Sequence, residues 1–253
     1  DEVKQIREEM DKEADRLSGN PFNRVFWPWE CEAYDLPRYN IYDKLKAGGV
    51  LLIIAPPKHG KSFTALEIAW SVSSGRPFLG LFPVDVRGGV LYVAGEGEDE
   101  TAGRIIARHR ASGEPYPRML AIYPHPHDLR DVGANTALLE WARGKGFVCV
   151  IFDTVSRCGG GKEDAEDLTK LVSGVSRLNQ ELGVTVILLH HTPKEDKGSS
   201  RGHTSLPAAV DTQWLMAKRD GAYTITASFA RSAEEDDDGA FAGLGYCQTC
   251  IPP

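Results

Sequence analysis

A lysine and a serine that follow a short turn are the residues of this sequence most clearly suited to chemistry. The apolar run that begins at Val50 breaks into a turn with two prolines, which ends in Gly60, Lys61 and Ser62, where a helical pattern begins. At such a turn, backbone N–H groups and the positive end of the helix dipole converge on one anion. Lys61 would reach the β- and γ-phosphates of a nucleotide, and the Ser62 hydroxyl would hold Mg²⁺.

This turn departs from the usual phosphate-loop pattern at one position. The pattern is G-x-x-x-x-G-K-[ST], and Ala55 stands where the first glycine is usual. The alternative is an ordinary strand–turn–helix unit with a surface lysine, but the apolar strand and the helical pattern on either side favour the phosphate loop. We therefore predict a triphosphate cradle formed by Pro57, Lys58, His59, Gly60, Lys61, Ser62 and Phe63.

Asp153 is the candidate for a second Mg²⁺ ligand. It ends an apolar run, and a carboxylate at the carboxyl end of a strand can bind Mg²⁺ directly or through water beside Ser62. Its alternative role is that of an ordinary turn residue. Thr154 follows Asp153, whereas a glutamate is expected in ATPases whose catalytic carboxylate adjoins the metal ligand. The general base is therefore expected elsewhere.

Glu96 is predicted to be that base. It follows the apolar run Gly89–Ala94, and a carboxylate there would face the γ-phosphate, orient the attacking water and take its proton. Glu98 is the second choice, and both residues could instead be solvated loop carboxylates.

Two adjacent histidines end another apolar run. Neighbouring residues of a strand point to opposite faces, so His190 and His191 do not form a chelating pair. One is expected to pack within the fold, and the other to contact the γ-phosphate as a sensor. We favour His191 as the sensor and keep His190 as the alternative.

The elements that must position these residues alternate between strands and helices. Unbroken apolar strands separated by helices are typical of a mostly parallel sheet that is buried on both faces. Two later strands, joined at 219–221, predict an antiparallel extension at one edge. The expected strands are the one that begins at Val50, before the phosphate loop, and then 89–94, 119–123, 147–153, 184–189, 213–217 and 223–229, and the expected helices are 61–75, 100–112, 134–143 and 165–182.

Composition and charge are typical of a soluble globular protein. The 253 residues are 42% hydrophobic and 26% charged, which allows one large α/β domain. The apolar runs are too short to cross a bilayer and no leader pattern opens the sequence, so we expect a cytoplasmic protein with no membrane contact. The net charge of −7 argues against coating nucleic acid over the whole surface but allows a local basic channel.

The ends of the chain differ in composition from the middle. Residues 1–18 have a thin amphipathic helical pattern, which either stays solvated or docks on a neighbouring subunit. Residues 20–42 are rich in aromatic residues and prolines, which either cover a core edge or stack on a nucleobase. Five cysteines argue against a disulfide framework, and only Cys247 and Cys250 have metal-ligand spacing, with two unpaired tail thiols as the simpler interpretation.

Five segments of the chain occur in the same order as in a known ATPase family. Residues 55–62, 95–98, 152–157, 190–194 and 200–205 resemble the motifs of the RecA-like P-loop ATPases similar to the RepA plasmid replicative helicases. The resemblance covers roughly residues 40 to 232. It implies ATP and Mg²⁺ as ligands, with Lys61 and Ser62 on the triphosphate and metal, Glu96 as catalytic base, Asp153 on Mg²⁺ and His191 as sensor. We accordingly divide the chain into an N-terminal arm (1–40), a RecA-like ATPase domain (41–232) and an acidic turn with a tail (233–253).

The resemblance also implies a ring. Members of the group act as homo-hexamers whose ATP sites lie between subunits, each completed by a basic finger from the neighbour. Gln213 stands where the plasmid helicases have an arginine, so the finger is expected elsewhere. Arg231 is the first candidate, and Lys218 and Arg219 are weaker ones.

In ring helicases of this class, the loops after the Asp153 and His191 strands face a central channel. The corresponding loops here contain glycines and cations, as expected of loops that contact phosphates, although such loops are also basic by chance. The implied contacts with single-stranded DNA are Arg157, Lys162, Lys194, Lys197 and Arg201. Nothing in these loops predicts the reading of bases.

These observations predict a Mg²⁺-dependent ATPase motor, with a hexameric replicative DNA helicase that also contacts other replication proteins as the favoured function. The alternative is an ATP-gated DNA- or protein-binding assembly module, such as a loader or recombination mediator, without unwinding activity. A nucleotide kinase is disfavoured because the sequence has no arginine-rich lid.

Overall fold

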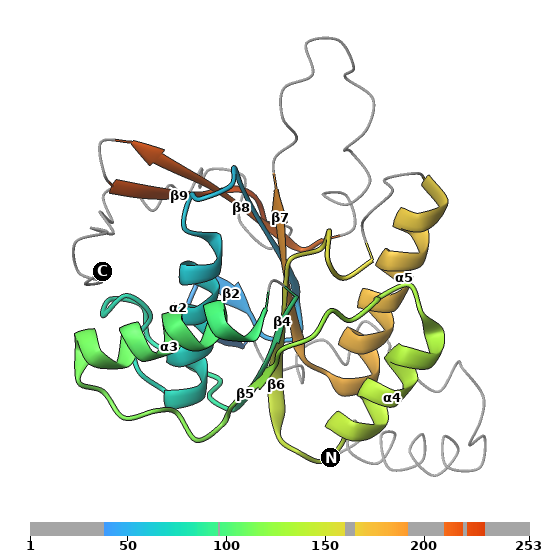
Figure 1. Ribbon diagram of the computed structural model, residues 1–253, viewed down its shortest axis with the longest axis horizontal. Helices are drawn as coiled ribbons and strands as arrows, with labels where there is room; N and C mark the ends of the chain where they lie inside the picture. Colours follow the sequence, from blue (N-terminus) through green and yellow to red (C-terminus); the bar gives the residue numbers. More distant parts are fainter. Residues whose placement is uncertain (1–37, 96, 160–164, 192–209, 220–221, 231–253) are drawn as a thin grey trace, which may run out of the picture. The chain divides into compact units, whose positions relative to one another are not determined.

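The computed structural model describes residues 38–95, 97–159, 165–191, 210–219 and 222–230, so residues 1–37 of the predicted N-terminal arm and the whole acidic tail lie outside these ranges. Helices and strands alternate through most of the described chain (Figure 1). The strands are β1 (Tyr39–Ile41), β2 (Leu45–Lys46), β3 (Val50–Ala55), β4 (Gly89–Ala94), β5 (Leu120–Tyr123), β6 (Phe147–Asp153), β7 (Thr185–His191), β8 (Thr212–Arg219) and β9 (Ala222–Ala230). The helices are α2 (Lys61–Ser74), α3 (Glu98–Ser112), α4 (Val132–Ala142) and α5 (Ala165–Leu182).

A seven-stranded sheet with the order β5-β4-β6-β7-β3-β8-β9 forms the centre of the fold. All pairings from β5 to β8 are parallel, and β9 pairs antiparallel with β8 at the edge. The central strands are almost fully buried because helices cover both faces of the sheet. The predicted α/β class, with a mostly parallel sheet and an antiparallel extension, is confirmed.

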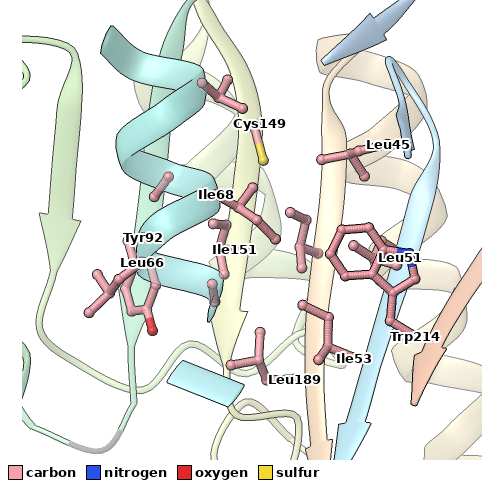
Figure 2. Close-up of a cluster of buried hydrophobic side chains, with 14 of the residues drawn as sticks. Leu45, Leu51, Ile53, Leu66, Ile68, Tyr92, Cys149, Ile151, Leu189 and Trp214 are labelled. Carbon is pink, nitrogen blue, oxygen red and sulfur yellow. The ribbon is translucent and has the colours of Figure 1, made fainter. Parts of the chain in front are cut away.

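Two hydrophobic clusters lie on the two faces of the sheet. One cluster joins α2 to side chains of β3, β4, β6, β7 and β8, and Figure 2 shows part of it, with Ile68 of α2 beside Ile151 and with Tyr92 beside Leu66. The other cluster joins α4 and α5 to the opposite face through Leu139, Leu171 and Val175. Figure 1 shows α2 and α3 on one side of the sheet and α4 and α5 on the other.

Because side chains alternate along a strand, each of the central strands β3, β4, β6 and β7 contributes to both clusters. Ile187 and Leu189 of β7 face α2, whereas Val186 and Leu188 face α5. This alternation decides which polar residue at the end of each strand reaches the phosphate loop.

Several boundaries differ by one or two residues from the sequence-based expectation, among them the starts of α3 and α4 and the end of β7. α3 begins at Glu98 rather than at residue 100, with three acidic residues in its first turn that complement the helix dipole. α4 begins at Val132 rather than at residue 134, because the Asp131 carboxylate accepts hydrogen bonds from the N–H groups of Gly133 and Ala134 and so caps the helix. β7 extends through His191, which places both histidines inside the strand.

The helices of the described ranges include none that is long and apolar enough to cross a membrane.

Candidate active site

The predicted phosphate loop connects the carboxyl end of β3 to the start of α2. Lys58 and Gly60 have positive φ angles of 63° and 83°. The Thr64 N–H donates to the Gly60 carbonyl at 2.9 Å, which begins the helix, and no side chain of the described residues caps it. The first-turn N–H groups of α2 therefore point out of the helix without a side-chain acceptor, as an anion site requires.

Glycine is required at position 60 for two reasons. Its positive φ is strained for a residue with a side chain. A Cβ at this position would also lie 3.0 Å from the ring of Tyr223, which stands on β9 beside the loop. Gly60 thus lets the edge hairpin and the phosphate loop approach each other closely.

Lys61 lies against the carboxyl ends of β3 and β7. Its Nζ donates to the carbonyls of Ala55 at 2.9 Å and Pro56 at 3.1 Å, and it lies 3.0 Å from Nδ1 of His191. The side chain is buried. The ammonium group is therefore held at the loop by its own backbone, within reach of any phosphate that enters the cradle.

Asp153 ends β6 on the same face of the sheet. It is 2% exposed, and its Oδ2 accepts a hydrogen bond of 2.6 Å from the hydroxyl of Tyr92 on β4. Its other oxygen, Oδ1, is buried and has no hydrogen-bond partner within the described residues. A buried carboxylate oxygen without a donor is costly, and a cation is the ligand that would satisfy it. Asp153 therefore fits the predicted role of Mg²⁺ ligand.

The two histidines at the end of β7 lie on opposite faces. His190 is in register with Ile54, and His191 with Ala55, the last residue before the loop. The contact with Lys61 places the His191 ring on the face of α2, whereas His190 is on the alternate face. The structure thus brings the favoured sensor residue, and not its neighbour, to the phosphate loop.

Glu96 lies outside the described residues, but the residues on both sides of it are described. The Gly95 N–H donates to the Asp153 carbonyl at 2.7 Å, so the end of β4 is tied to the end of β6. A Cβ at Gly95 would lie 2.8 Å from Cβ of Arg157, which explains the glycine. The second-choice base, Glu98, is exposed in the first turn of α3. The role of Glu96 as catalytic base stays a prediction.

A partly buried ionic cluster, which sequence reasoning missed, joins α2 to α3. Arg108 donates to both carboxylate oxygens of Glu67, at 2.6 and 3.1 Å, and to Glu114 at 3.0 Å. Glu114 also accepts from the indole N–H of Trp70 at 2.9 Å and from Arg76 at 2.7 Å. This cluster fixes the helix that follows the phosphate loop against the helix that follows Glu96. A glutamate within an otherwise apolar helical face was the signal available in the sequence.

Tyr92 was also missed. It is the one side chain with a hydroxyl in the run Gly89–Ala94, and a buried tyrosine hydroxyl usually has a partner. That partner is Asp153.

The remaining predicted residues are distributed as follows. Pro57 and Lys58 are exposed, and His59, Ser62 and Phe63 are half-buried at the loop. Lys218 of β8 lies over the Tyr223 ring at 5.3 Å, and Gln213 pairs with Leu52 near the middle of β3. Lys162, Lys194, Lys197, Arg201 and Arg231 lie outside the described residues.

The segment after β6 is less open than the sequence suggested. Arg157 is exposed, but Cys158 is fully buried, and its carbonyl accepts from the Leu129 N–H at 3.0 Å. Gly159 packs against Asp128, where a Cβ would lie 2.3 Å from Oδ1. The start of the predicted DNA loop is therefore anchored in the core.

Neither described cysteine is available as a metal ligand. Cys149 and Cys158 are free and buried, and burial raises the pKa of the Cys158 thiol to about 11, so the thiol stays protonated at neutral pH. Among the residues with described positions, no three His, Cys, Asp or Glu side chains gather as a metal cluster. Mg²⁺ bound through one carboxylate, one hydroxyl, water and phosphate oxygens needs no such cluster.

Comparison with solved structures agrees with this architecture. A solved chain described as an ATPase domain aligns with a TM-score of 0.53 and 13% sequence identity, over 74% of this chain and 78% of that chain. At this identity the likeness concerns the fold, and it confirms the RecA-like P-loop fold predicted from the sequence. No curated protein matches the chain.

Comparison with family models gives the family. The model described as an AAA domain, AAA_25, matches residues 28–197, which include the phosphate loop, Asp153 and both histidines. The chain therefore belongs to the AAA domain family AAA_25, with the RecA-like fold of a P-loop ATPase.

Proposed function

We propose that this chain hydrolyses ATP with Mg²⁺ and, as a ring-shaped homo-hexamer, uses the energy to translocate on or unwind DNA. The observation that carries the ATPase part is the convergence of Lys61, His191 and a buried, unsatisfied oxygen of Asp153 at the carboxyl ends of adjacent parallel strands. In open α/β sheets, ligands bind at this end of the strands.

The residues would divide the reaction between them. Lys61 and the first-turn N–H groups of α2 would bind the β- and γ-phosphates. Ser62 and Asp153 would hold Mg²⁺, which neutralises negative charge on the phosphate oxygens when it is bound. His191 beside Lys61 would respond to the γ-phosphate.

Glu96 would orient a water molecule and take its proton as the water oxygen bonds to the γ-phosphorus. The bond between the γ-phosphorus and the bridging oxygen breaks, and ADP leaves with that oxygen. Lys61 and a basic finger from a neighbouring subunit, with Arg231 as first candidate, would stabilise the charge that develops.

The motor part of the proposal rests on the resemblance to the RepA-type helicases and on the AAA_25 family membership. The basic residues Arg157, Lys162, Lys194, Lys197 and Arg201 would contact phosphates of single-stranded DNA in the ring channel.

Two assays test this function against the assembly-module alternative. The molar mass in solution, measured with and without an ATP analogue and single-stranded DNA, should reach that of a hexamer when both are present. A strand-displacement assay should show ATP-dependent unwinding by the wild-type chain and none by Glu96→Gln, which should still bind nucleotide. Rings that bind ATP but show no DNA stimulation and no displacement would favour the module.

A further inference from the structure

The hydroxyl of Tyr92 reaches the metal-facing carboxylate from a neighbouring strand. Tyr92 stands on β4 with no exposed surface, and its Oη donates to Oδ2 of Asp153 at 2.6 Å. Oδ1 of the same carboxylate is buried and has no partner in the described parts of the chain. Before any ligand binds, Oδ2 of Asp153 thus already accepts a hydrogen bond, whereas Oδ1 does not.

The register of β4 and β6 explains this contact. Tyr92 is opposite Ile151, and Ala94 is opposite Asp153, so Tyr92 and Asp153 are diagonal neighbours on one face. Diagonal neighbours are within reach when one side chain is aromatic. Because Ala94 carries only a methyl group, the tyrosine hydroxyl passes beside it to the carboxylate. The ring is packed in the cluster beneath α2, close to Leu66 (Figure 2), so the position of the hydroxyl is set by the core.

We propose that Tyr92 is a positioning residue for the metal: its hydroxyl occupies Oδ2 of Asp153 and leaves Oδ1 as the oxygen that binds Mg²⁺. The inference rests on the proposed Mg²⁺-dependent ATPase. Mg²⁺ demands near-ideal octahedral geometry, and a ligand fixed in one orientation meets that demand better than one that rotates. Hydrogen-bond partners of metal ligands typically contribute about 10- to 100-fold to metal affinity or activity.

The test is Tyr92→Phe, which keeps the ring and removes one oxygen atom. The readout is binding of a fluorescent, non-hydrolysable ATP analogue during a Mg²⁺ titration. We expect the Mg²⁺ concentration at half-saturation to rise about tenfold, whereas analogue binding in EDTA stays at the wild-type level. Tyr123→Phe, the same change at an exposed position of β5, should behave as wild type.

A merely structural role of Tyr92 makes a different prediction. It would lower the melting temperature and weaken analogue binding equally with and without Mg²⁺. A Tyr92→Phe variant whose half-saturating Mg²⁺ concentration stays within twofold of wild type would overturn the inference. This comparison uses protein shown to be folded by circular dichroism.

Asp153→Asn separates failure of this inference from failure of the proposed function. This variant is expected to raise the half-saturating Mg²⁺ concentration more than Tyr92→Phe does, and adding Tyr92→Phe to it should cause no further shift. If Asp153→Asn leaves the Mg²⁺ dependence unchanged, the metal site itself is wrong. If Asp153→Asn changes it and Tyr92→Phe does not, only the role of Tyr92 is wrong.

Discussion

The two faces of the central sheet carry different kinds of residues at the ends of the same strands. On the face covered by α2 and α3, Lys61 contacts His191 at 3.0 Å, and Asp153 accepts from Tyr92 at 2.6 Å. On the face covered by α4 and α5, the residues beyond the strands are mostly apolar, and Val155 and Cys158 are buried there. Neighbouring positions at the end of one strand therefore differ in role: one side chain faces the proposed catalytic site, and the next packs against α4 and α5.

The largest effect is expected from removing the phosphate-loop lysine. Lys61→Ala should reduce ATP turnover by at least about 100-fold, because it removes a preorganised charge from the site of the transferred phosphoryl group. The matched change on the other face, Lys170→Ala on α5, breaks an exposed pair with Glu166 and should leave turnover unchanged. A steady-state phosphate-release assay measures both variants.

The histidine pair gives the sharpest version of the comparison. His191→Ala should reduce turnover by roughly tenfold or more, because its ring contacts the Lys61 ammonium group. A hydrogen bond to a charged group contributes about 1.5–3 kcal/mol, and about 1.4 kcal/mol changes a rate tenfold. His190→Ala, one position earlier and on the opposite face, should change turnover per folded molecule by less than about twofold, as expected for a residue away from the reacting groups. Equal losses for the two variants would contradict the assignment of faces.

The ionic cluster between α2 and α3 should matter for stability more than a similar pair between α4 and α5. Arg108→Ala leaves Glu67, which is 8% exposed, without its two-pronged partner, and we expect a loss of about 1–3 kcal/mol in the free energy of unfolding. Arg143→Ala breaks an exposed bond to Glu181 and should cause no measurable loss. Urea denaturation of both variants tests this difference.

The smallest expected effect is a pH dependence of stability that comes from the same cluster. Burial raises the pKa of Glu114, but the positive charges of Arg108 and Arg76 outweigh burial, so its pKa lies below the ordinary value of 4.5. A lowered pKa in the folded state stabilises the protein at neutral pH, and this contribution is lost as the pH falls below 4.5 through the lowered value. Arg108→Ala should weaken this dependence, which denaturation between about pH 7 and about pH 3 would measure.

Much of the fold follows from patterns in the sequence. The buried strands read as unbroken apolar runs, so β4 and β6 have the predicted bounds, β3 begins where the apolar run begins, and α5 begins and ends at the predicted residues. The starts of α3 and α4 were less predictable. The carboxylate cap of Asp131 and the acidic turn at Glu98 extend α4 and α3 by two residues each beyond the apolar periodicity.

Site residues that belong to a sequence motif could be predicted. Residues that reach the site through a contact between distant strands or helices could not. Lys61 and Asp153 follow from the phosphate loop and from the end of an apolar run. Tyr92 and Arg108 act through partners far away in the sequence, and only the register of β4 with β6 and the packing of α3 on α2 bring them together. A pattern within one segment of the sequence does not indicate how that segment pairs with a distant strand or packs on a distant helix.

The central claim is that the α2 face forms a Mg²⁺-ATP site coupled to DNA. The most direct measurement is the ATP turnover of the wild-type chain with Mg²⁺, with and without single-stranded DNA. The account predicts Mg²⁺-dependent hydrolysis that rises several-fold when DNA is added and that disappears in EDTA. Hydrolysis that is absent under all conditions, or that is indifferent to both Mg²⁺ and DNA, would contradict it.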